Sequence, residues 1–350
     1  MGNPVLKKIG AGEFLRLSET IPVIDVRSPS EYSAGHIPGA VNIPLFNDEQ
    51  RAAVGTKYKK EGRQSAILAG LELSGPDLKE KLLKAIETAS DGRLLVHCWR
   101  GGMRSEAMAW LFSLGDLQTE VLEGGYKSYR HLVLESLSER RKTIVLGGMT
   151  GSGKTQILNH IKNLGHKVID LEALANHKGS AFGALGQAQQ PTGEQFSNFL
   201  AAEWRKTDRE FPLWLEDESR NIGTVFMPDA FFRNMQVSPT IVLLLDMEKR
   251  LPRLIREYSE YPPGLLIASI DKISKRLGGD NARDAKKAVE TGDFQKAIEI
   301  TLRYYDNTYM FSIRRKPGEN IIYVNTDTDD ALENAMKVIE ASGRIKWVSA

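Results

Sequence analysis

The segment GMTGSGKT, residues 148–155, has the residue types that hold a phosphate group. It lies between the apolar run TIVLGG and the segment QILNHIKNL, whose apolar spacing predicts a helix. Gly148, Gly151 and Gly153 allow a tight turn that directs successive N–H groups inward, and the helix adds its positive N-terminal end. We call residues 148–155 the phosphate loop and expect it to bind a diphosphate; the alternative is a glycine-rich turn without a ligand.

Charged and hydroxyl side chains extend this predicted site. Lys154 is placed to contact the terminal phosphate, and the Thr155 hydroxyl is placed to ligate Mg²⁺ if a metal accompanies the ligand. No tightly bound cofactor is expected. The predicted diphosphate-binding residues are Gly148, Gly151, Ser152, Gly153, Lys154 and Thr155.

A carboxylate that helps to hold such a metal should stand at the end of a neighbouring strand. The segment WLEDES offers Glu216, Asp217 and Glu218 where an apolar run ends, and we predict that Asp217 takes this role. Asp170 and Asp246 also end predicted strands, but a helix-capping role suits them equally well.

A second group of residues surrounds Cys98, the only cysteine of the chain. It follows the apolar run RLLVH and precedes a helical pattern, and two glycines permit a tightly curved loop. Backbone N–H groups and two arginines would favour the thiolate, the reactive form of cysteine. We call residues 98–105 the cysteine loop; the alternative is a buried, unreactive cysteine. The residues expected to support Cys98 are Trp99, Arg100, Gly101, Gly102 and Arg104.

A single cysteine excludes an intramolecular disulfide and a zinc site with several cysteines. With no second cysteine to resolve it, a sulfur or selenium atom carried on Cys98 would pass directly to an acceptor. This favours a chalcogen transferase over a disulfide reductase. The neighbouring His97 is a candidate general base, although a histidine within a strand more often packs in a core.

The elements that must position the cysteine loop alternate between strands and helices, which predicts an α/β domain. The expected strands and helices are, in chain order, residues 21–26, 76–89, 93–98, 103–114, 119–125 and 126–141. The charged segment LSERRK precedes a new apolar strand and marks the boundary. We therefore predict a first domain over residues 1–140.

The phosphate loop belongs to a second predicted domain, residues 141–350. Apolar runs separated by helix-length segments favour a parallel sheet covered on both faces. The expected strands are residues 143–148, 167–170, 212–216, 240–246 and 320–325. Residues 247–310 are helical in pattern, with Pro252 and the pair Pro262–Pro263 as expected helix breaks.

The same helical stretch is the predicted nucleic-acid surface, with an ordinary solvated helix face as the alternative. Its basic residues are Arg250, Arg253, Arg256, Lys272, Lys275, Arg276, Arg283, Lys286 and Lys287. The net charge of +2 decides nothing by itself, because balanced totals can conceal a basic face.

Longer motifs carry a family resemblance. The segment IDVRSPSEYSAGHIPGAVNIP, together with CWRGGMRS, resembles a rhodanese domain. Followed by the phosphate loop, VIDLEALANHKGSAFG and WLEDESRNIG, it is similar to the bacterial tRNA 2-selenouridine synthase family along most of the chain. The resemblance implies an N-terminal rhodanese-like domain, then a P-loop NTPase-like parallel-sheet domain with a helical C-terminal region.

The resemblance also implies an activity. It is that of a transferase that converts 2-thiouridine to 2-selenouridine at wobble position 34 of tRNAs for lysine, glutamate and glutamine. Geranyl diphosphate first alkylates the thiocarbonyl sulfur, and selenium from selenophosphate then replaces the geranylated sulfur. Cys98 would carry selenium as an S-selanyl group, and Trp99 would stack on the base or form a wall of the loop. Asp25 and Arg27 would brace the cysteine loop rather than react.

Two rival functions are compatible with the residues: an ATP-dependent tRNA sulfurtransferase or kinase, and an RNA-binding module with an inactive rhodanese domain. Substrate-stimulated ATP turnover would favour the first, and the intact cysteine loop argues against the second. The chain is 41% hydrophobic and 26% charged, and no apolar run approaches the roughly 20 residues that span a bilayer. Its start lacks a signal-peptide pattern, so we expect a cytoplasmic location and no membrane partner.

Overall fold

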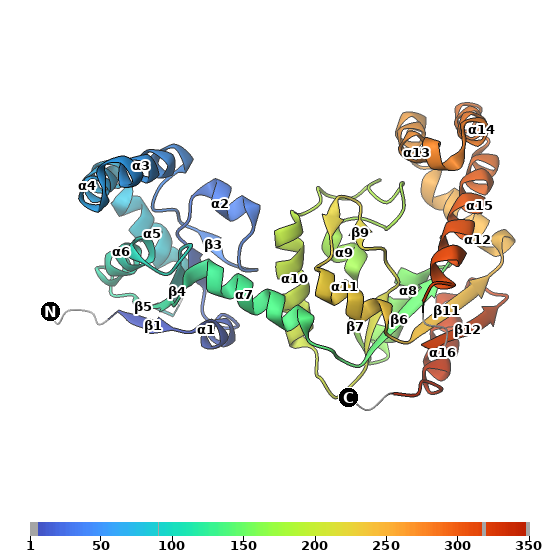
Figure 1. Ribbon diagram of the computed structural model, residues 1–350, viewed down its shortest axis with the longest axis horizontal. Helices are drawn as coiled ribbons and strands as arrows, with labels where there is room; N and C mark the ends of the chain where they lie inside the picture. Colours follow the sequence, from blue (N-terminus) through green and yellow to red (C-terminus); the bar gives the residue numbers. More distant parts are fainter. Residues whose placement is uncertain (1–5, 90, 317–319, 348–350) are drawn as a thin grey trace. The chain divides into compact units, whose positions relative to one another are not determined.

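The structure is a computed structural model that describes residues 6–89, 91–316 and 320–347. Two compact units make up the chain, residues 1–136 with 197–201 and residues 137–196 with 202–350 (Figure 1). The first unit contains the cysteine loop, and the second contains the phosphate loop.

The first unit is built on a parallel sheet with the strand order β1-β5-β4-β2-β3. Its strands are β1 (Lys7–Ile9), β2 (Val23–Asp25), β3 (Val41–Asn42), β4 (Arg93–His97) and β5 (Gln118–Leu122). Its helices are α1 (Ala11–Leu17), α2 (Pro29–Ala34), α3 (Asp48–Glu61), α4 (Arg63–Ser74), α5 (Leu78–Thr88), α6 (Met103–Ser113) and α7 (Gly125–Ser138), with a 3₁₀ turn at Gly75–Asp77. Strands β2 and β4 are buried almost throughout, as is typical of parallel strands covered on both faces.

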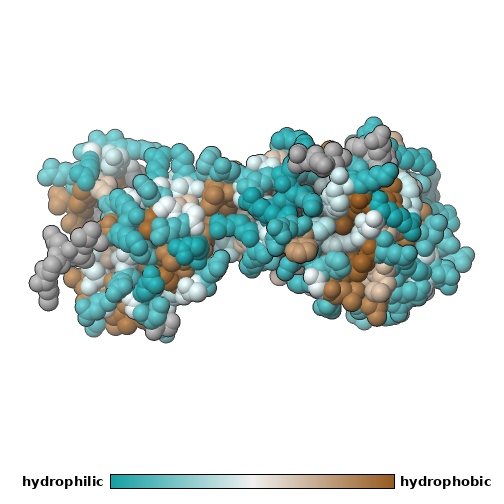
Figure 2. All heavy atoms as spheres, turned by 90° about the horizontal axis from the view of Figure 1, so that it is seen from below, coloured by the Kyte–Doolittle hydropathy of each residue, from teal (hydrophilic) through white to brown (hydrophobic). Residues whose placement is uncertain are grey.

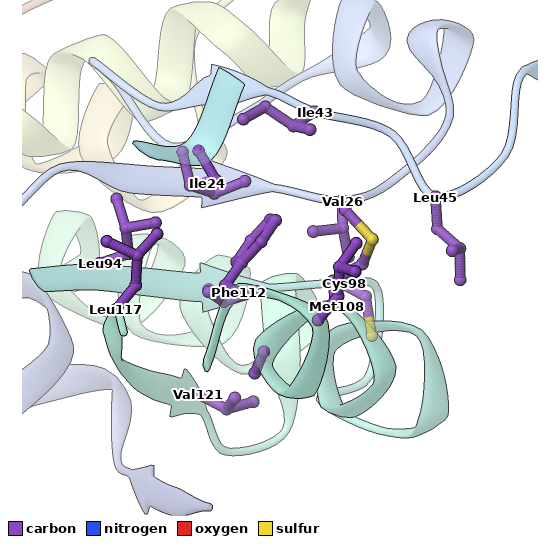
Figure 3. Close-up of a cluster of buried hydrophobic side chains, with 14 of the residues drawn as sticks. Ile24, Val26, Ile43, Leu45, Leu94, Cys98, Met108, Phe112, Leu117 and Val121 are labelled. Atoms are coloured by element: carbon purple, nitrogen blue, oxygen red, sulfur yellow. The ribbon is translucent and has the colours of Figure 1, made fainter. Parts of the chain in front are cut away.

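The core of the first unit joins apolar side chains of the sheet to those of α5 and α6. Figure 3 shows Cys98 in this cluster, near Val26 and Met108. The cysteine loop therefore starts from a packed core, which fixes the position of its first residue.

The second unit is built on another parallel sheet, with the strand order β12-β11-β6-β8-β7. Its strands are β6 (Thr143–Gly148), β7 (Lys167–Ile169), β8 (Leu213–Glu216), β11 (Thr240–Leu245) and β12 (Ile321–Thr326), and β9 (Asn221–Ile222) and β10 (Val225–Phe226) form a separate antiparallel pair. The helices that follow β6 along the chain are α8 (Lys154–Asn163), α9 (Leu171–Ala175), α10 (Gly193–Lys206), α11 (Asp229–Gln236), α12 (Met247–Tyr258), α13 (Pro263–Leu277), α14 (Gly279–Glu290), α15 (Phe294–Ile313) and α16 (Ala331–Ser342).

Strand β6 pairs with β8 on one side and β11 on the other. The phosphate loop leaves its carboxyl end and is therefore flanked by the ends of two other strands, the usual position of a ligand site in such sheets. Helices α13, α14 and α15 build a core of their own, to which Phe182 and Leu185 contribute from the segment between α9 and α10. That segment is thus packed against the helical region.

The predicted α/β class with parallel sheets is confirmed in both units. The prediction for Pro252 is wrong, because this residue lies inside α12, a helix held by its buried residues Arg250 and Leu254. Pro262 and Pro263 do mark a boundary, since α13 begins there. Helices α3 and α4 have no counterpart among the predicted elements, because their residues lack a clear helical periodicity, and the short helices α1 and α2 are likewise unpredicted.

Hydrophilic residues predominate on the face shown in Figure 2, and hydrophobic residues gather in separate patches. The exposed apolar side chains include Leu68 and Leu71 of α4 and Leu83 of α5. Across the described part of the chain, no helix has both the length and the apolar character that a membrane crossing requires.

Candidate active site

The phosphate loop turns sharply between β6 and α8. Gly151 and Gly153 have φ angles of 82° and 80°, a region that favours glycine. Helix α8 begins at Lys154, whose Nζ donates a hydrogen bond to Gly148 O at 3.1 Å. The loop amides, the start of a helix and an ammonium group therefore occur together, as anion binding requires.

Arginines of α12 hold the carbonyl oxygens of this loop. Arg250 Nη1 donates to Thr150 O at 2.8 Å, and Arg253 Nη1 donates to Gly151 O at 3.3 Å. Arg250 is 2% exposed and donates to the two carboxylate oxygens of Asp306 at 3.0 and 2.6 Å. Two loop carbonyl groups are engaged in this way. The Gly148 and Ser152 N–H groups donate within the protein, to Tyr309 Oη and Met149 O, so an anion would be bound by the other loop amides.

Asp217 belongs to a network that anchors the start of the loop. Its carboxylate accepts hydrogen bonds from Lys316 Nζ at 2.5 Å and from the Tyr309 hydroxyl at 3.2 Å. The Tyr309 hydroxyl in turn accepts one from the Gly148 N–H at 2.8 Å. Both oxygens of Asp217 are thus engaged, so the structure points to a bracing role instead of the expected metal-side role.

Three other carboxylates gather near the Thr155 hydroxyl. Glu172, Glu216 and Glu218 each place an oxygen within 4.8 Å of the others. Thr155 Oγ1 lies 3.2 Å from Glu172 Oε2 and 3.1 Å from Glu216 Oε1, and its single proton can serve only one of them. Burial and the Glu172 carboxylate raise the pKa of Glu218 to about 8, and they also raise the pKa of Glu216 well above its usual value. These carboxylates therefore resist carrying full negative charge together.

The phosphate loop lines an open cleft of about 1100 Å³. Its other basic lining residues are Lys178, Arg220, Arg253, Arg256, Arg276 and Lys316. An aromatic part is formed by Tyr258, Tyr261, Tyr304, Tyr305 and Tyr309. The cleft thus brings basic and aromatic side chains to the same ligand, and acidic residues, among them Glu172, Glu216 and Glu218, line it as well.

The cysteine loop packs directly against a second glycine turn. Gly101 has a φ of 65°, and a Cβ there would lie 2.4 Å from Leu122 O and 2.9 Å from Gly125 N. A Cβ on Gly125 would lie 2.5 Å from Cys98 O, which accepts a hydrogen bond from the Tyr126 N–H at 2.8 Å. Two stretches of backbone meet here, so only glycine fits at either position.

The surroundings of the sulfur differ from the expected ones. Cys98 is 3% exposed, and its Sγ lies 3.2 Å from Ser105 Oγ. Arg104 donates to the Glu31 carboxylate at 2.6 and 3.3 Å, so a neighbouring acid matches its charge. Arg100 is exposed, as is Trp99 at 38%. The Ser105 hydroxyl therefore lies within hydrogen-bonding distance of the sulfur, whereas of the two arginines expected to favour the thiolate, Arg104 is paired with Glu31 and Arg100 is exposed.

A fully buried ion pair lies beneath the aromatic side chains near this loop. Arg27 Nη2 donates to Asp25 Oδ2 at 2.6 Å, and its guanidinium carbon is 3.8 Å from the Tyr126 ring centroid. Burial lowers the pKa of the neighbouring His97, so its imidazole is neutral at neutral pH and Arg27 is the cation that matches Asp25. Such burial suits the bracing role predicted for Asp25 and Arg27, and it makes His97 a poor general base.

Comparisons with known proteins agree on one family. Residues 10–132 match the rhodanese-like domain model, and residues 141–262 match the model of the tRNA 2-selenouridine synthase AAA domain. The tRNA 2-selenouridine synthase of Nitrosomonas europaea is 34% identical, over 84% of this chain and 90% of that protein. Those of Sulfurovum sp. and Bdellovibrio bacteriovorus are 36% and 35% identical, over 89% and 98% of this chain and 93% and 89% of theirs. The chain belongs to the tRNA 2-selenouridine synthase family.

Membership of the tRNA 2-selenouridine synthase family confirms the resemblance predicted from the motifs. The second family model ends at residue 262, however, and several residues that hold the phosphate loop lie beyond it. Asp306, Tyr309 and Lys316 form hydrogen bonds to Arg250, Gly148 and Asp217, respectively.

Several residues around the two loops have no part in the predicted sites. Ser105 lies within the recognised segment CWRGGMRS, and its distance of seven positions from Cys98 gave no signal without the loop geometry. Glu172 follows a predicted strand by two positions, which is a weak signal for a strand-end site. Arg250 and Tyr309 are far from the phosphate loop in sequence and carry no signal at all.

Proposed function

We propose that the chain converts 2-thiouridine to 2-selenouridine at wobble position 34 of tRNA, and the name of its relatives, tRNA 2-selenouridine synthase, supports this product. One observation carries the proposal: a phosphate loop with two carbonyl groups held by arginines occurs in the same chain as a cysteine loop whose Cys98 is buried. Such loops suit a departing diphosphate and a transferred chalcogen. The proposed enzyme class is transferase.

In the first proposed step, geranyl diphosphate alkylates the sulfur of 2-thiouridine. A bond forms between sulfur and C1 of the geranyl group, the bond from C1 to the diphosphate oxygen breaks, and the base loses its N3 proton. Diphosphate leaves. The loop N–H groups and Lys154 would stabilise the charge that develops on it, so no ATP hydrolysis is required.

The aromatic part of the cleft supports geranyl diphosphate as the ligand. Tyr258, Tyr261 and Tyr304 line the same cleft as the phosphate loop. Aromatic faces bury hydrocarbon and stabilise positive charge of the kind that develops at C1 as diphosphate departs. We expect geranyl diphosphate to bind more tightly than ATP, which competition binding measures directly.

In the second proposed step, selenium replaces the geranylated sulfur. The overall reaction takes S-geranyl-2-thiouridine, selenophosphate and water to 2-selenouridine, geranyl thiol and phosphate, so no oxidant or reductant is consumed. Alkylation assists because a thiocarbonyl sulfur is a poor leaving group, whereas geranyl thiol departs readily. We assign Cys98 to this step as the residue that holds the incoming selenium at the selenide level, with Ser105 as a positioning residue for its sulfur. The bond from C2 of the base to selenium forms, the bond from C2 to sulfur breaks as geranyl thiol leaves, and water takes up the phosphoryl group.

The tRNA acceptors proposed from the resemblance are those for lysine, glutamate and glutamine. Their wobble base lies in a single-stranded loop and can turn out into a pocket. Lys272 and Lys275 of α13 and Lys287 of α14 are exposed and suit phosphate contacts. Arg250, which was predicted as part of this surface, is instead buried and donates a hydrogen bond to the phosphate loop. Changing Lys272 and Lys275 together to alanine should weaken tRNA binding and reduce its salt dependence.

Mass spectrometry of digested tRNA tests whether the phosphate loop serves geranylation and Cys98 serves selenation. Lys154→Ala should stop geranylation, whereas Cys98→Ser should block selenation and allow geranylated tRNA to accumulate. Lys162→Ala, which changes an exposed lysine of α8, is the matched control and should leave both steps unchanged. Failure of both variants at the same step contradicts the proposal, and tRNA-stimulated ATP turnover without geranyl diphosphate would favour the ATP-dependent rival.

A further inference from the structure

We propose that Glu172, Glu216 and Glu218, together with Thr155, form a divalent-cation site that is assembled before any diphosphate arrives. Mg²⁺ in phosphate-transfer sites is usually held by one or two carboxylates together with substrate phosphates. A site made of protein oxygens alone is a different arrangement. The inference rests on the geometry near the phosphate loop and does not depend on which diphosphate the chain uses.

The first support is convergence from three segments of the chain. Glu172 lies in α9, Glu216 ends β8, and Glu218 follows it after one residue. Their oxygens lie within 4.8 Å of one another, and Thr155 Oγ1 contacts two of the three groups. Opposite ligands around an octahedral Mg²⁺ are about 4.2 Å apart, so a small contraction would close this set around an ion.

The second support is a buried oxygen without a donor. Glu216 is 1% exposed, and among the described residues its Oε2 has no hydrogen-bond partner. Its other oxygen, Oε1, lies 3.1 Å from Thr155 Oγ1, whose single proton it shares with Glu172. Leaving a buried carboxylate oxygen unsatisfied is costly, and a cation held among the three carboxylates would give this oxygen the partner that it lacks.

The third support is the balance of charge. The nearby cation is the Lys154 ammonium group, which itself donates to a carbonyl oxygen, Gly148 O. Two other lysines that line the cleft are engaged elsewhere, Lys178 with Glu257 and Lys316 with Asp217. A divalent ion among the three carboxylates would offset their mutual repulsion.

The backbone of the segment after α9 lies beside the carboxylates of Glu172 and Glu218. Gly179 has a φ of 69°, and a Cβ there would lie 2.7 Å from Glu218 Oε1 and 2.9 Å from Glu172 Oε1. The absence of a side chain at this position leaves room beside the carboxylates. Hard carboxylate and hydroxyl oxygens select Mg²⁺, Mn²⁺ or Ca²⁺ over softer metals.

Electron paramagnetic resonance of Mn²⁺ tests the proposal on the full chain in the absence of diphosphate. The signal of free Mn²⁺ should fall as one ion binds per chain, and Mg²⁺ should compete. Glu172→Gln and Glu216→Gln should each weaken binding by about tenfold or more, as loss of a supporting metal interaction does. Glu260→Gln is the matched control, because Glu260 is an exposed acid that lines the same cleft, and it should bind Mn²⁺ like the wild type.

Two results would overturn the proposal. If Mn²⁺ bound only after inorganic pyrophosphate was added, the site would not be assembled in advance. If both glutamine variants bound Mn²⁺ as tightly as the wild type while circular dichroism showed them folded, the ion would lie elsewhere. Geranyl transfer is measured separately: normal Mn²⁺ binding without geranylation would refute the proposed function and leave the cation site standing.

Discussion

The two loops differ in how their surrounding charges are matched. Around the cysteine loop, the Asp25 carboxylate pairs with Arg27, and the Arg104 guanidinium pairs with Glu31. Near the phosphate loop, Glu172, Glu216 and Glu218 each place a carboxylate oxygen within 4.8 Å of the others, and burial together with the Glu172 carboxylate raises the pKa of both Glu216 and Glu218. Matched charges position a loop that acts through its own sulfur. Unmatched charges, by contrast, are typical of a site that is completed by a ligand.

Removing one member of the matched pair should have the largest effect. Asp25→Asn leaves Arg27 buried without a counter-charge, and we expect the free energy of unfolding of the first unit to fall by about 3–5 kcal/mol. Denaturant unfolding followed by hydrogen exchange and mass spectrometry measures each unit separately. Glu87→Gln, at an exposed site of α5, is the control. Equal stability of the two variants would show that the pair adds nothing.

The pH dependence sharpens this first test. Burial alone would raise the pKa of Asp25, but the Arg27 guanidinium, which donates hydrogen bonds to its carboxylate, lowers that pKa below its usual value. A carboxyl group whose pKa is lower in the folded state stabilises the fold above its unfolded pKa, and that stabilisation is lost as the pH falls through the folded value. The difference in stability between the wild type and Asp25→Asn should therefore be constant near neutral pH and shrink in acid.

Arg250→Met should have the next largest effect. It removes the guanidinium that donates to Thr150 O and leaves Asp306 unpaired. We expect the free energy of unfolding to fall by about 3 kcal/mol, the lower end for a buried pair, because Asp306 is 17% exposed. Affinity for inorganic pyrophosphate should fall as well, measured by calorimetry. Lys249→Met, at the exposed neighbouring position, should change neither quantity. Unchanged pyrophosphate affinity in Arg250→Met would contradict the bracing role.

A pair of glycine variants should give a smaller and purely steric effect. Gly101→Ala forces a side chain onto the backbone of Leu122 and Gly125 and should cost about 2 kcal/mol or more. Gly102→Ala has open space at its Cβ and no positive φ, so it should be tolerated. Unfolding curves and the rate of Cys98 alkylation compare the two. Similar behaviour would mean that the close backbone contact does not control the loop.

The smallest expected effect has the opposite sign. Glu216→Gln removes one of three crowded carboxylates and offers its amide to the other two, so the metal-free chain should gain about 1 kcal/mol of stability. Thermal unfolding in a chelator measures this gain, with Glu260→Gln as the control. A loss of stability would show that the three carboxylates are well accommodated without a cation. It would contradict the difference in charge matching between the two loops.

Local sequence patterns predict the features that depend on neighbouring residues. Apolar runs predict both parallel sheets, and Gly-x-x-x-x-Gly-Lys-Thr predicts the phosphate loop. Contacts between distant segments escape it. Asp217 and Glu216 are adjacent in sequence, yet alternate side chains of a strand point in opposite directions, so one braces the loop and the other joins the acidic cluster. Arg250 likewise reads as a surface cation until the fold brings Asp306 beside it.

Residues of α15 anchor the phosphate loop, and this matters when a truncated copy of the gene is judged from its motifs. A chain that stopped after residue 262 would retain every recognised motif and both family matches. It would nevertheless lack Asp306 and Tyr309, and with them the partners of Arg250 and of the first loop amide. A frameshift in that last quarter of the reading frame should therefore abolish diphosphate binding in a gene that motif searches would score as intact.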